Sequence, residues 1–251
     1  MMKEGSFQFK QFTIQQDRCA MKVGTDGVLL GAWADISHYA VDTKRKYNIL
    51  DIGAGTGIIS LMLAQRAAEA GIDFQIDAVE IDQDAAQQAT ENINDSPWAR
   101  HISVFPLSLQ EFEHQADKSY DLIVSNPPFY NATLKPQDNG RAVARHKDAL
   151  PITEIAHFAS KRLAENGRLS IIFPTNYDSE VMTAIVLSGL HPVRFFDILT
   201  KVGKPCKRRM AEFAAESVPL LREQLAIRNA DGKYTEEYRA LTSAFYLHLT
   251  D

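Results

Sequence analysis

The hydrophobic positions of this chain predict buried strands that alternate with amphipathic helices. From Tyr47 onward, short apolar runs are separated by longer stretches whose apolar residues recur at helical spacing. The runs are nearly continuous, which is typical of parallel strands covered on both faces. The expected strands are residues 47–52, 75–80, 102–106, 120–124, 168–173, 193–199 and 209–215. The expected helices are residues 57–69, 84–94, 152–164, 177–187 and 235–249, with a helical turn after Ser108.

This alternation predicts a Rossmann-like α/β fold with a mixed, mostly parallel, seven-stranded sheet and helices on both faces. The last two strands are expected to form an antiparallel pair at one edge. The last helix is expected to turn four side chains inward: Tyr238, Leu241, Phe245 and Leu249. We interpret residues 1–46 as a short N-terminal capping segment and residues 47–251 as the rest of a single domain. Residues 127–150 are expected to be irregular, and connections of this length are usually either functional or disordered.

Composition narrows the classes of protein that are compatible with the chain. Of 251 residues, 45% are hydrophobic and 24% are charged, which is ordinary for a soluble globular protein. No apolar run approaches the roughly 20 residues needed to cross a bilayer, and no signal peptide is apparent. The cysteines, Cys19 and Cys206, are too few and too isolated for a disulfide framework or a metal cage. We expect a cytoplasmic protein without a metal and without a membrane partner.

The net charge of −5 argues against a surface coated by nucleic acid but leaves room for a local basic face. One basic cluster, Arg141, Arg145, His146 and Lys147, lies in the irregular stretch. A second cluster consists of Lys201, Lys204, Lys207, Arg208 and Arg209. Either cluster is compatible with an ordinary solvated loop.

A glycine-rich turn follows the first expected strand. The strand carries Asp51 near its end, and Gly53, Gly55 and Gly57 follow at alternate positions. Glycines allow a tight reversal and a close approach of a ligand to the backbone. Dinucleotide-binding turns space the glycines differently, and an acid at this point would repel pyrophosphate. The carboxylate of Asp51 suits the ammonium of S-adenosylmethionine. Glu80, after the second strand, can accept hydrogen bonds from ribose hydroxyls.

The sequence Asn126-Pro127-Pro128-Phe129 follows the fourth expected strand. The side-chain oxygen of Asn126 and the carbonyl of Pro127 can accept both N–H bonds of a planar amino group. Holding both bonds favours a pyramidal nitrogen and frees its lone pair, and Phe129 can stack on a base. Open α/β sheets bind ligands at the ends of such strands, so we interpret the tetrapeptide as catalytic rather than as a plain turn.

These elements resemble the class I S-adenosylmethionine-dependent methyltransferases that carry an Asn-Pro-Pro-(Tyr/Phe) motif. The chain is most similar to the bacterial valine-tRNA adenine methyltransferases, from about residue 7 to residue 247. That likeness is carried by residues 8–12, 17–27, 30–33, 91–94, 96–98 and 234–246. It implies methylation of the 6-amino group of the adenosine 3′ of the anticodon.

The resemblance also implies roles for individual residues. It places Asn126, Pro127, Pro128 and Phe129 at the target base. It assigns the following residues to the cofactor: Lys22, Thr25, Asp26, Asp51, Gly53, Gly55, Gly57, Glu80, Ile81, Ser108 and Asn126. Ser108 stands where the family usually has an acid near the cofactor adenine, so Gln110 or Glu111 can take that role instead.

The partner implied is the anticodon stem-loop of tRNA, whose target base must leave its stack. We expect Arg141, Arg145 and Lys147 to grip its phosphates. The alternative with the same site is a protein glutamine methyltransferase that acts on a release factor, but such enzymes carry their own recognition domain before the sheet. DNA adenine methyltransferases need a target-recognition domain, for which we expect no room in this chain. The glycine spacing argues against a nicotinamide dehydrogenase, and the intact Asn126-Pro127 pair argues against a binding module without catalysis.

Overall fold

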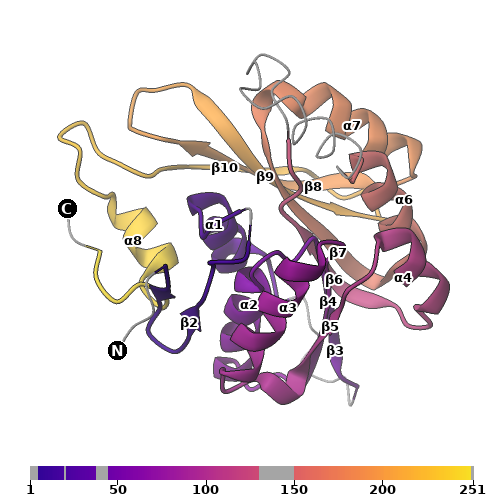
Figure 1. The fold of residues 1–251 in the computed structure, drawn as a ribbon. Coiled ribbons are helices and arrows are strands. Elements are labelled where there is room, and N and C mark those ends of the chain that lie inside the picture. Colours follow the sequence, from indigo (N-terminus) through magenta and orange to yellow (C-terminus); the bar gives the residue numbers. More distant parts are fainter. Residues whose placement is uncertain (1–4, 20, 38–44, 130–149, 250–251) are drawn as a thin grey trace, which may run out of the picture.

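A computed structural model describes residues 5–19, 21–37, 45–129 and 150–249. The main strands are β3 (Tyr47–Ile52), β4 (Phe74–Val79), β5 (Ile102–Phe105), β6 (Tyr120–Ser125), β7 (Leu163–Pro174), β8 (His191–Leu199), β9 (Cys206–Ala214) and β10 (Leu221–Ala226). They form one eight-stranded sheet in the order β10-β8-β9-β7-β6-β3-β4-β5 (Figure 1). Two short strands, β1 (Phe7–Gln8) and β2 (Thr13–Ile14), pair separately.

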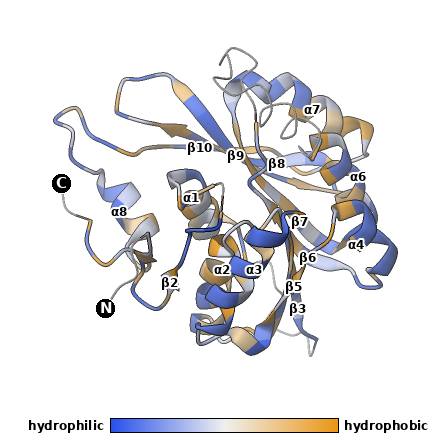
Figure 2. Cartoon of the chain, in the orientation of Figure 1, coloured by the Kyte–Doolittle hydropathy of each residue, from blue (hydrophilic) through white to orange (hydrophobic). Residues whose placement is uncertain are grey.

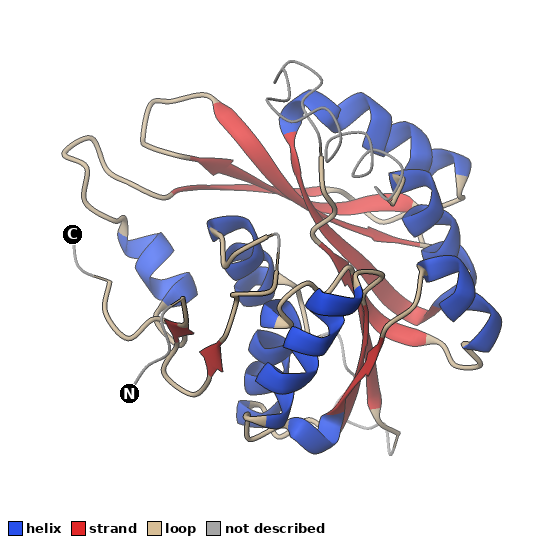
Figure 3. Cartoon of the chain, viewed as in Figure 1, coloured by secondary structure: helices blue, strands red, loops and turns tan. Residues whose placement is uncertain are grey.

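Helices cover both faces of the sheet (Figure 3). One group consists of α1 (Thr25–Trp33), α2 (Ile58–Glu69) and α3 (Gln83–Asn94). The other consists of α4 (Leu109–Gln115), α6 (Ile152–Arg162) and α7 (Asp178–Leu187). The remaining helices are α8 (Glu236–Thr242) and the 3₁₀ turns η1 (Ala99–His101) and η2 (Thr175–Tyr177). No helix in the described part of the chain is long and apolar enough to span a membrane.

The central strands are largely apolar because both of their faces are buried. Ile49 of β3 packs in the hydrophobic cluster that contains α1 and α2, whereas its neighbour Leu50 packs in the cluster that contains α4 and α6. Leu122 and Ile123 of β6 divide in the same way. Alternate residues of a strand point to opposite faces, so a strand between two helical layers carries apolar side chains on both of its faces. Figure 2 shows the contrast with α4, which is largely hydrophilic.

The fold class is confirmed, but the expected strand count is wrong by one. The eighth strand, β10, pairs in parallel with β8 at the edge of the sheet. Among its six residues only Leu225 is a buried hydrophobic side chain, so the segment carries little apolar signal, and backbone hydrogen bonds define it. The expected antiparallel pairing of the last two predicted strands is confirmed for β8 and β9. Its expected place at the edge is wrong, because β10 lies outside β8, and β9 also runs antiparallel to β7.

The ends of the chain pack on the same core as the sheet. Phe9, Ile14 and Phe245 belong to the cluster that contains Ile49. The expected helix 235–249 is too long, since α8 ends at Thr242. Beyond it the backbone turns and pairs with the N-terminal segment, where the N–H of Lys10 donates to the carbonyl of Phe245 at 2.8 Å. Of the four side chains expected to face inward, Tyr238 and Phe245 are buried, and Leu241 and Leu249 pack partly against the cluster.

The strand order creates a crevice beside β3. Its parallel neighbours are β4 on one side and β6 on the other, so the chain changes direction across the sheet at β3. Ligands of open α/β sheets bind outside the carboxyl ends of the strands at such a switch point. We call this side of the sheet the carboxyl edge. The strand β9 begins at the same edge, because Arg208 pairs with Pro174 at the end of β7.

Candidate active site

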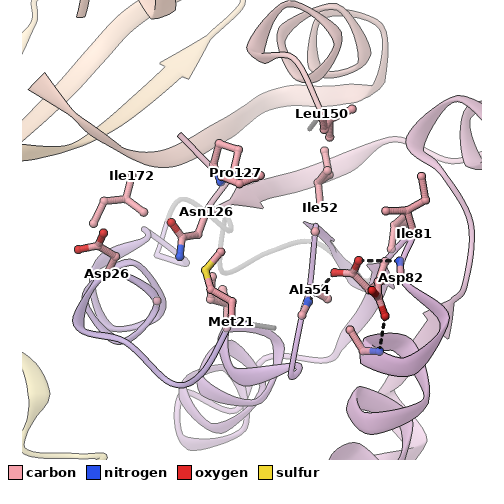
Figure 4. A pocket seen from close by; sticks show the side chains of 18 of the residues that line it. Met21, Asp26, Ile52, Ala54, Ile81, Asp82, Asn126, Pro127, Leu150 and Ile172 are labelled. Atoms are coloured by element: carbon pink, nitrogen blue, oxygen red, sulfur yellow. Dashed lines mark hydrogen bonds between the residues drawn. The ribbon is translucent and has the colours of Figure 1, made fainter. Parts of the chain in front are cut away.

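A cavity of about 1050 Å³ opens at the carboxyl edge. Its walls come from α1, the turn after β3, the segments after β4 and β5, and the Asn-Pro-Pro-Phe segment after β6. Figure 4 shows Asn126, Asp26 and Met21 around this space, on segments that come from different parts of the chain. The fold thus brings together segments that are far apart in the sequence.

The glycine turn after β3 has a left-handed backbone. Gly53 and Gly55 have φ of 72° and 56°, and a Cβ added at either would meet no atom within 4 Å. Both line the cavity, so their missing side chains leave room for a ligand. Gly57 plays a different part. It precedes α2 with φ of 80°, and a Cβ there would lie 3.4 Å from the Cβ of Ala89 in α3. Gly57 therefore serves helix packing and does not line the cavity.

Glu80 directly follows β4 and is fixed by two backbone groups. Its Oε2 accepts a hydrogen bond from the N–H of Gly55 at 2.8 Å. Its Oε1 accepts one from the N–H of Asp82 at 2.9 Å. The side chain lines the cavity although Glu80 is only 9% exposed. Each oxygen has a further lone pair, so the carboxylate can accept two more hydrogen bonds from hydroxyl groups.

Asp51 lies behind the turn and does not line the cavity. It is fully buried, and its Oδ2 accepts hydrogen bonds from the N–H and the hydroxyl of Ser60, at 3.1 and 2.7 Å. Burial raises the pKa of Asp51 to about 7, and these hydrogen bonds only partly oppose the rise. The carboxyl group therefore positions the first turn of α2, and any effect on a ligand passes through that turn.

All four residues of the Asn-Pro-Pro-Phe segment, 126–129, line the cavity. In Figure 4 the side-chain amide of Asn126 extends from the end of β6 into the open space. Pro127 is buried, which fixes the backbone beside that amide. The ring of Phe129 packs 4.9 Å from the ring of Tyr177 and 6.2 Å from that of Phe173, measured between centroids. An aromatic wall therefore stands next to the amide.

The N-terminal segment supplies the opposite wall. Lys22, Thr25 and Asp26 all line the cavity, as the family resemblance implies. Asp26 of α1 also forms an ion pair with Arg208 of β9, with Oδ2 and Nε 2.9 Å apart. Arg208 lines the cavity as well, although the sequence analysis places it only in a basic cluster. Its proximity depends on the antiparallel insertion of β9, which local sequence does not reveal.

The residues after β5 differ in how they meet the cavity. Ser108 lines the cavity, but it caps α4 in a capping box with Glu111. The Ser108 hydroxyl and the Glu111 carboxylate lie 2.7 Å apart and are engaged with each other, and Glu111 does not line the cavity. Gln110 does line it and donates to Glu154 of α6, which is also at the cavity wall. Ile81 borders the same region with half of its surface exposed.

The expected tRNA contacts Arg141, Arg145 and Lys147 lie outside the described residues. Within the described ranges, no three His, Cys, Asp or Glu side chains gather in a way that could hold a metal ion. Cys19 and Cys206 are both free thiols.

Comparison with known proteins identifies the family. A family model described as the methyltransferase small domain matches residues 36–191. The chain is 44% identical to the tRNA1(Val) (adenine(37)-N6)-methyltransferase of Flavobacterium johnsoniae, over 97% of this chain and 100% of that one. The chain belongs to this methyltransferase family. A protein of the same name from Trichodesmium erythraeum is 43% identical over 98% of this chain and 99% of its own length.

Solved structures of other methyltransferases share the fold at low sequence identity. A predicted O-methyltransferase from Agrobacterium tumefaciens gives a TM-score of 0.62 at 18% identity, over 87% of this chain and 96% of that one. Precorrin-6y C5,15-methyltransferase from Geobacter metallireducens gives 0.51 at 14% identity, over 82% and 93%. Family and fold together confirm the prediction of an S-adenosylmethionine-dependent methyltransferase.

Proposed function

We propose that this methyltransferase modifies the exocyclic 6-amino group of an adenosine in tRNA, namely the adenosine 3′ of the anticodon in tRNA(Val). One observation carries the proposal above the others. The amide of Asn126 faces the same cavity as the glycine turn and Glu80, so an amino group and a nucleoside cofactor can meet there. The names of the relatives support the choice of tRNA as substrate.

The cavity walls fit S-adenosylmethionine. Gly53 and Gly55 leave open space above the turn, and the oriented carboxylate of Glu80 can accept the hydroxyls of a ribose. Gln110 has a free carbonyl oxygen for the amino group of the cofactor adenine, whereas Ser108 is engaged in capping α4. Lys22, Thr25 and Asp26 would close the methionine side. When bound, the cofactor supplies an electrophilic methyl group on a sulfonium.

The reaction needs a nitrogen with an available lone pair. The 6-amino nitrogen of adenine is flat because its lone pair is delocalised into the ring. If the side-chain oxygen of Asn126 and the carbonyl of Pro127 accept its two N–H bonds, the nitrogen becomes pyramidal and nucleophilic. With the cofactor bound, a nitrogen–carbon bond would form as the carbon–sulfur bond breaks, and the nitrogen would then release a proton to water. Most of the acceleration would come from orientation of the reacting atoms.

The aromatic face of Phe129 favours a nucleobase over a glutamine side chain as the substrate group. Phe129, supported by Tyr177 and Phe173, offers a flat apolar face next to Asn126. Stacking of a base on such a face contributes about 1–3 kcal/mol. A glutamine side chain would gain little from that face, so this wall favours a nucleobase. Because the substrate is tRNA, we also propose a cytoplasmic location.

Incubation with methyl-labelled S-adenosylmethionine tests the proposal directly. Parallel reactions would contain unmodified tRNA(Val), the same tRNA with guanosine in place of the target adenosine, duplex DNA, or a release factor. We expect label only in the first reaction, as 6-methyladenosine after nucleoside digestion. Label in the release factor alone would replace the proposal by the glutamine alternative, and equal label in both tRNAs would move the target to another nucleotide.

A further inference from the structure

We propose that the loop between β8 and β9 is a docking site for the phosphate backbone of the tRNA substrate. This inference rests on the proposed function and adds a surface that the sequence analysis leaves open. The loop and the segment after β10 project from the same end of the sheet (Figure 1). Together with the first residues of β9 they form what we call the basic rim, which consists of Lys201, Lys204, Lys207, Arg208, Arg228 and Lys233.

The charge of the rim contrasts with the charge of the whole chain. Residues 200–208 contain four cationic side chains and no acidic one, whereas the chain carries a net charge of −5. Lys204 and Lys207 are exposed and pair with no acidic side chain in the described part of the chain. In the adjoining segment, Asp231 is the one acid between Arg228 and Lys233. Unpaired cations gathered on an acidic protein indicate a surface for a polyanion.

Backbone hydrogen bonds hold the two loops of the rim together. The N–H of Val202 donates to the carbonyl of Arg228 at 2.8 Å, and the N–H of Ile227 donates to the carbonyl of Leu199 at 2.8 Å. The guanidinium of Arg228 lies 4.2 Å from the centre of the Tyr234 ring. The backbones of the two loops are therefore held together, so the cations of both can face one phosphate backbone.

The rim adjoins the catalytic cavity. Lys207 directly precedes Arg208, which lines the cavity and pairs with Asp26. The hydroxyl of Thr175, in η2, donates to the carbonyl of Cys206 at 3.2 Å, which fixes the start of β9 beside the end of β7. A base that leaves its stack brings its flanking phosphates to the mouth of the pocket. We therefore expect the adjoining RNA backbone to meet Lys204 and Lys207, which precede Arg208 in the chain.

The fifth cation of the sequence cluster is excluded from the rim. Arg209 donates to Asp178 at 2.9 Å and to Asp197 at 2.6 Å, and only 14% of its side chain is exposed. Both acids neutralise it and fix β9 to β8 and α7. Neighbouring residues of one basic run thus have different tasks, since Lys207 faces solvent and Arg209 stabilises the fold.

The double variant Lys204→Gln/Lys207→Gln tests the rim in the full-length protein. Binding of unmodified tRNA(Val) would be measured by fluorescence anisotropy between about 50 and 250 mM KCl. We expect weaker binding. We also expect the salt slope, that is, the slope of the logarithm of the binding constant against the logarithm of the salt concentration, to be smaller in magnitude by about two, because each lysine–phosphate contact contributes about one. The maximal methylation rate at saturating tRNA and the affinity for S-adenosylmethionine should not change, which shows that the variant is folded.

The matched control is Lys46→Gln/Arg100→Gln. Both side chains are exposed, and they lie just before β3 and β5, at the opposite edge of the sheet. Their loss should leave the slope unchanged. If wild-type protein methylates tRNA but the rim variant keeps its slope, or if both double variants lose slope equally, the rim is not the docking site. Wild-type protein that neither binds nor methylates tRNA would instead refute the proposed function, and the rim with it.

Discussion

Glu80 and Gly55 are joined by a hydrogen bond of 2.8 Å from the backbone N–H of the glycine to the carboxylate. The bond connects the ends of two adjacent parallel strands, 25 residues apart. It aligns the acid that would hold the ribose with the turn that makes room for the cofactor. The cofactor half of the site is therefore preorganised by the sheet itself.

The first prediction concerns the charge of Glu80. Glu80→Gln keeps the shape but removes the negative charge and one acceptor oxygen. Because charge-assisted hydrogen bonds contribute about 1.5–3 kcal/mol, the affinity for S-adenosylmethionine should fall by about ten- to a hundred-fold. Isothermal titration calorimetry measures the change. Glu165→Gln, at an exposed position, is the control and should bind like wild type. Equal affinity in the two variants would contradict the assignment.

The second prediction separates chemistry from binding at Asn126. Asn126→Ala should lower the maximal rate by about a thousand-fold, since groups aimed at developing charge contribute to that order. Affinity for S-adenosylmethionine should stay close to wild type, because the turn and Glu80 are untouched. Single-turnover methylation and calorimetry give the two values, with Asn94→Ala, exposed at the end of α3, as the control. A rate within a few-fold of wild type would refute the proposed mechanism.

The third prediction distinguishes Ser108 from Gln110. Ser108→Ala should lower the free energy of unfolding by about 1 kcal/mol through loss of the cap of α4. It should leave cofactor affinity nearly unchanged. Gln110→Ala should instead weaken cofactor binding by about five-fold, the value of one hydrogen bond, at little cost in stability. Chemical denaturation and calorimetry on both variants check this, and the opposite pattern would restore Ser108 as the group that contacts adenine.

The fourth prediction follows from the raised pKa of Asp51. An unfolded aspartate has a pKa near 3.8, and burial raises that of Asp51 to about 7. Between these values the unfolded state loses its proton first, so rising pH lowers the free energy of unfolding of wild type. Asp51→Asn cannot titrate. Its stability relative to wild type should therefore increase between pH 4 and 7 and level off above 7.

Each unit of pKa shift corresponds to about 1.4 kcal/mol, so the total change should be on the order of 2–4 kcal/mol. Thermal or urea unfolding of both proteins at several pH values between about 4 and 8 measures it. A difference in stability that stays constant across this range would show that Asp51 is ionised in the folded state throughout.

The fifth prediction contrasts Arg209 with the basic rim. Arg209→Gln leaves Asp178 and Asp197 without their shared cation, and we expect a loss of about 1–3 kcal/mol of stability. The salt slope of tRNA binding should remain that of wild type. Urea unfolding and anisotropy test the two statements, and a reduced slope would mean that Arg209 also contacts RNA.

The sequence by itself determines the class of fold and the chemistry of the site. Short, largely apolar runs such as 120–124 indicate strands buried on both faces, and Gly53 and Gly55 are needed where the backbone is left-handed. The Asn126-Pro127 pair carries its chemistry in the residue types themselves. These signals are local, so a single segment of chain is enough to read them.

The tertiary structure alone decides which residues share the cavity and which support it. Asp51 and Gly57 belong to the same motif as Gly53, yet they pack against helices because the turn faces the cavity on one side only. Arg208 reaches the site through the antiparallel insertion of β9, and β10 is a strand through backbone pairing despite its polar sequence. Contacts between distant segments depend on strand order and register, which no local pattern specifies.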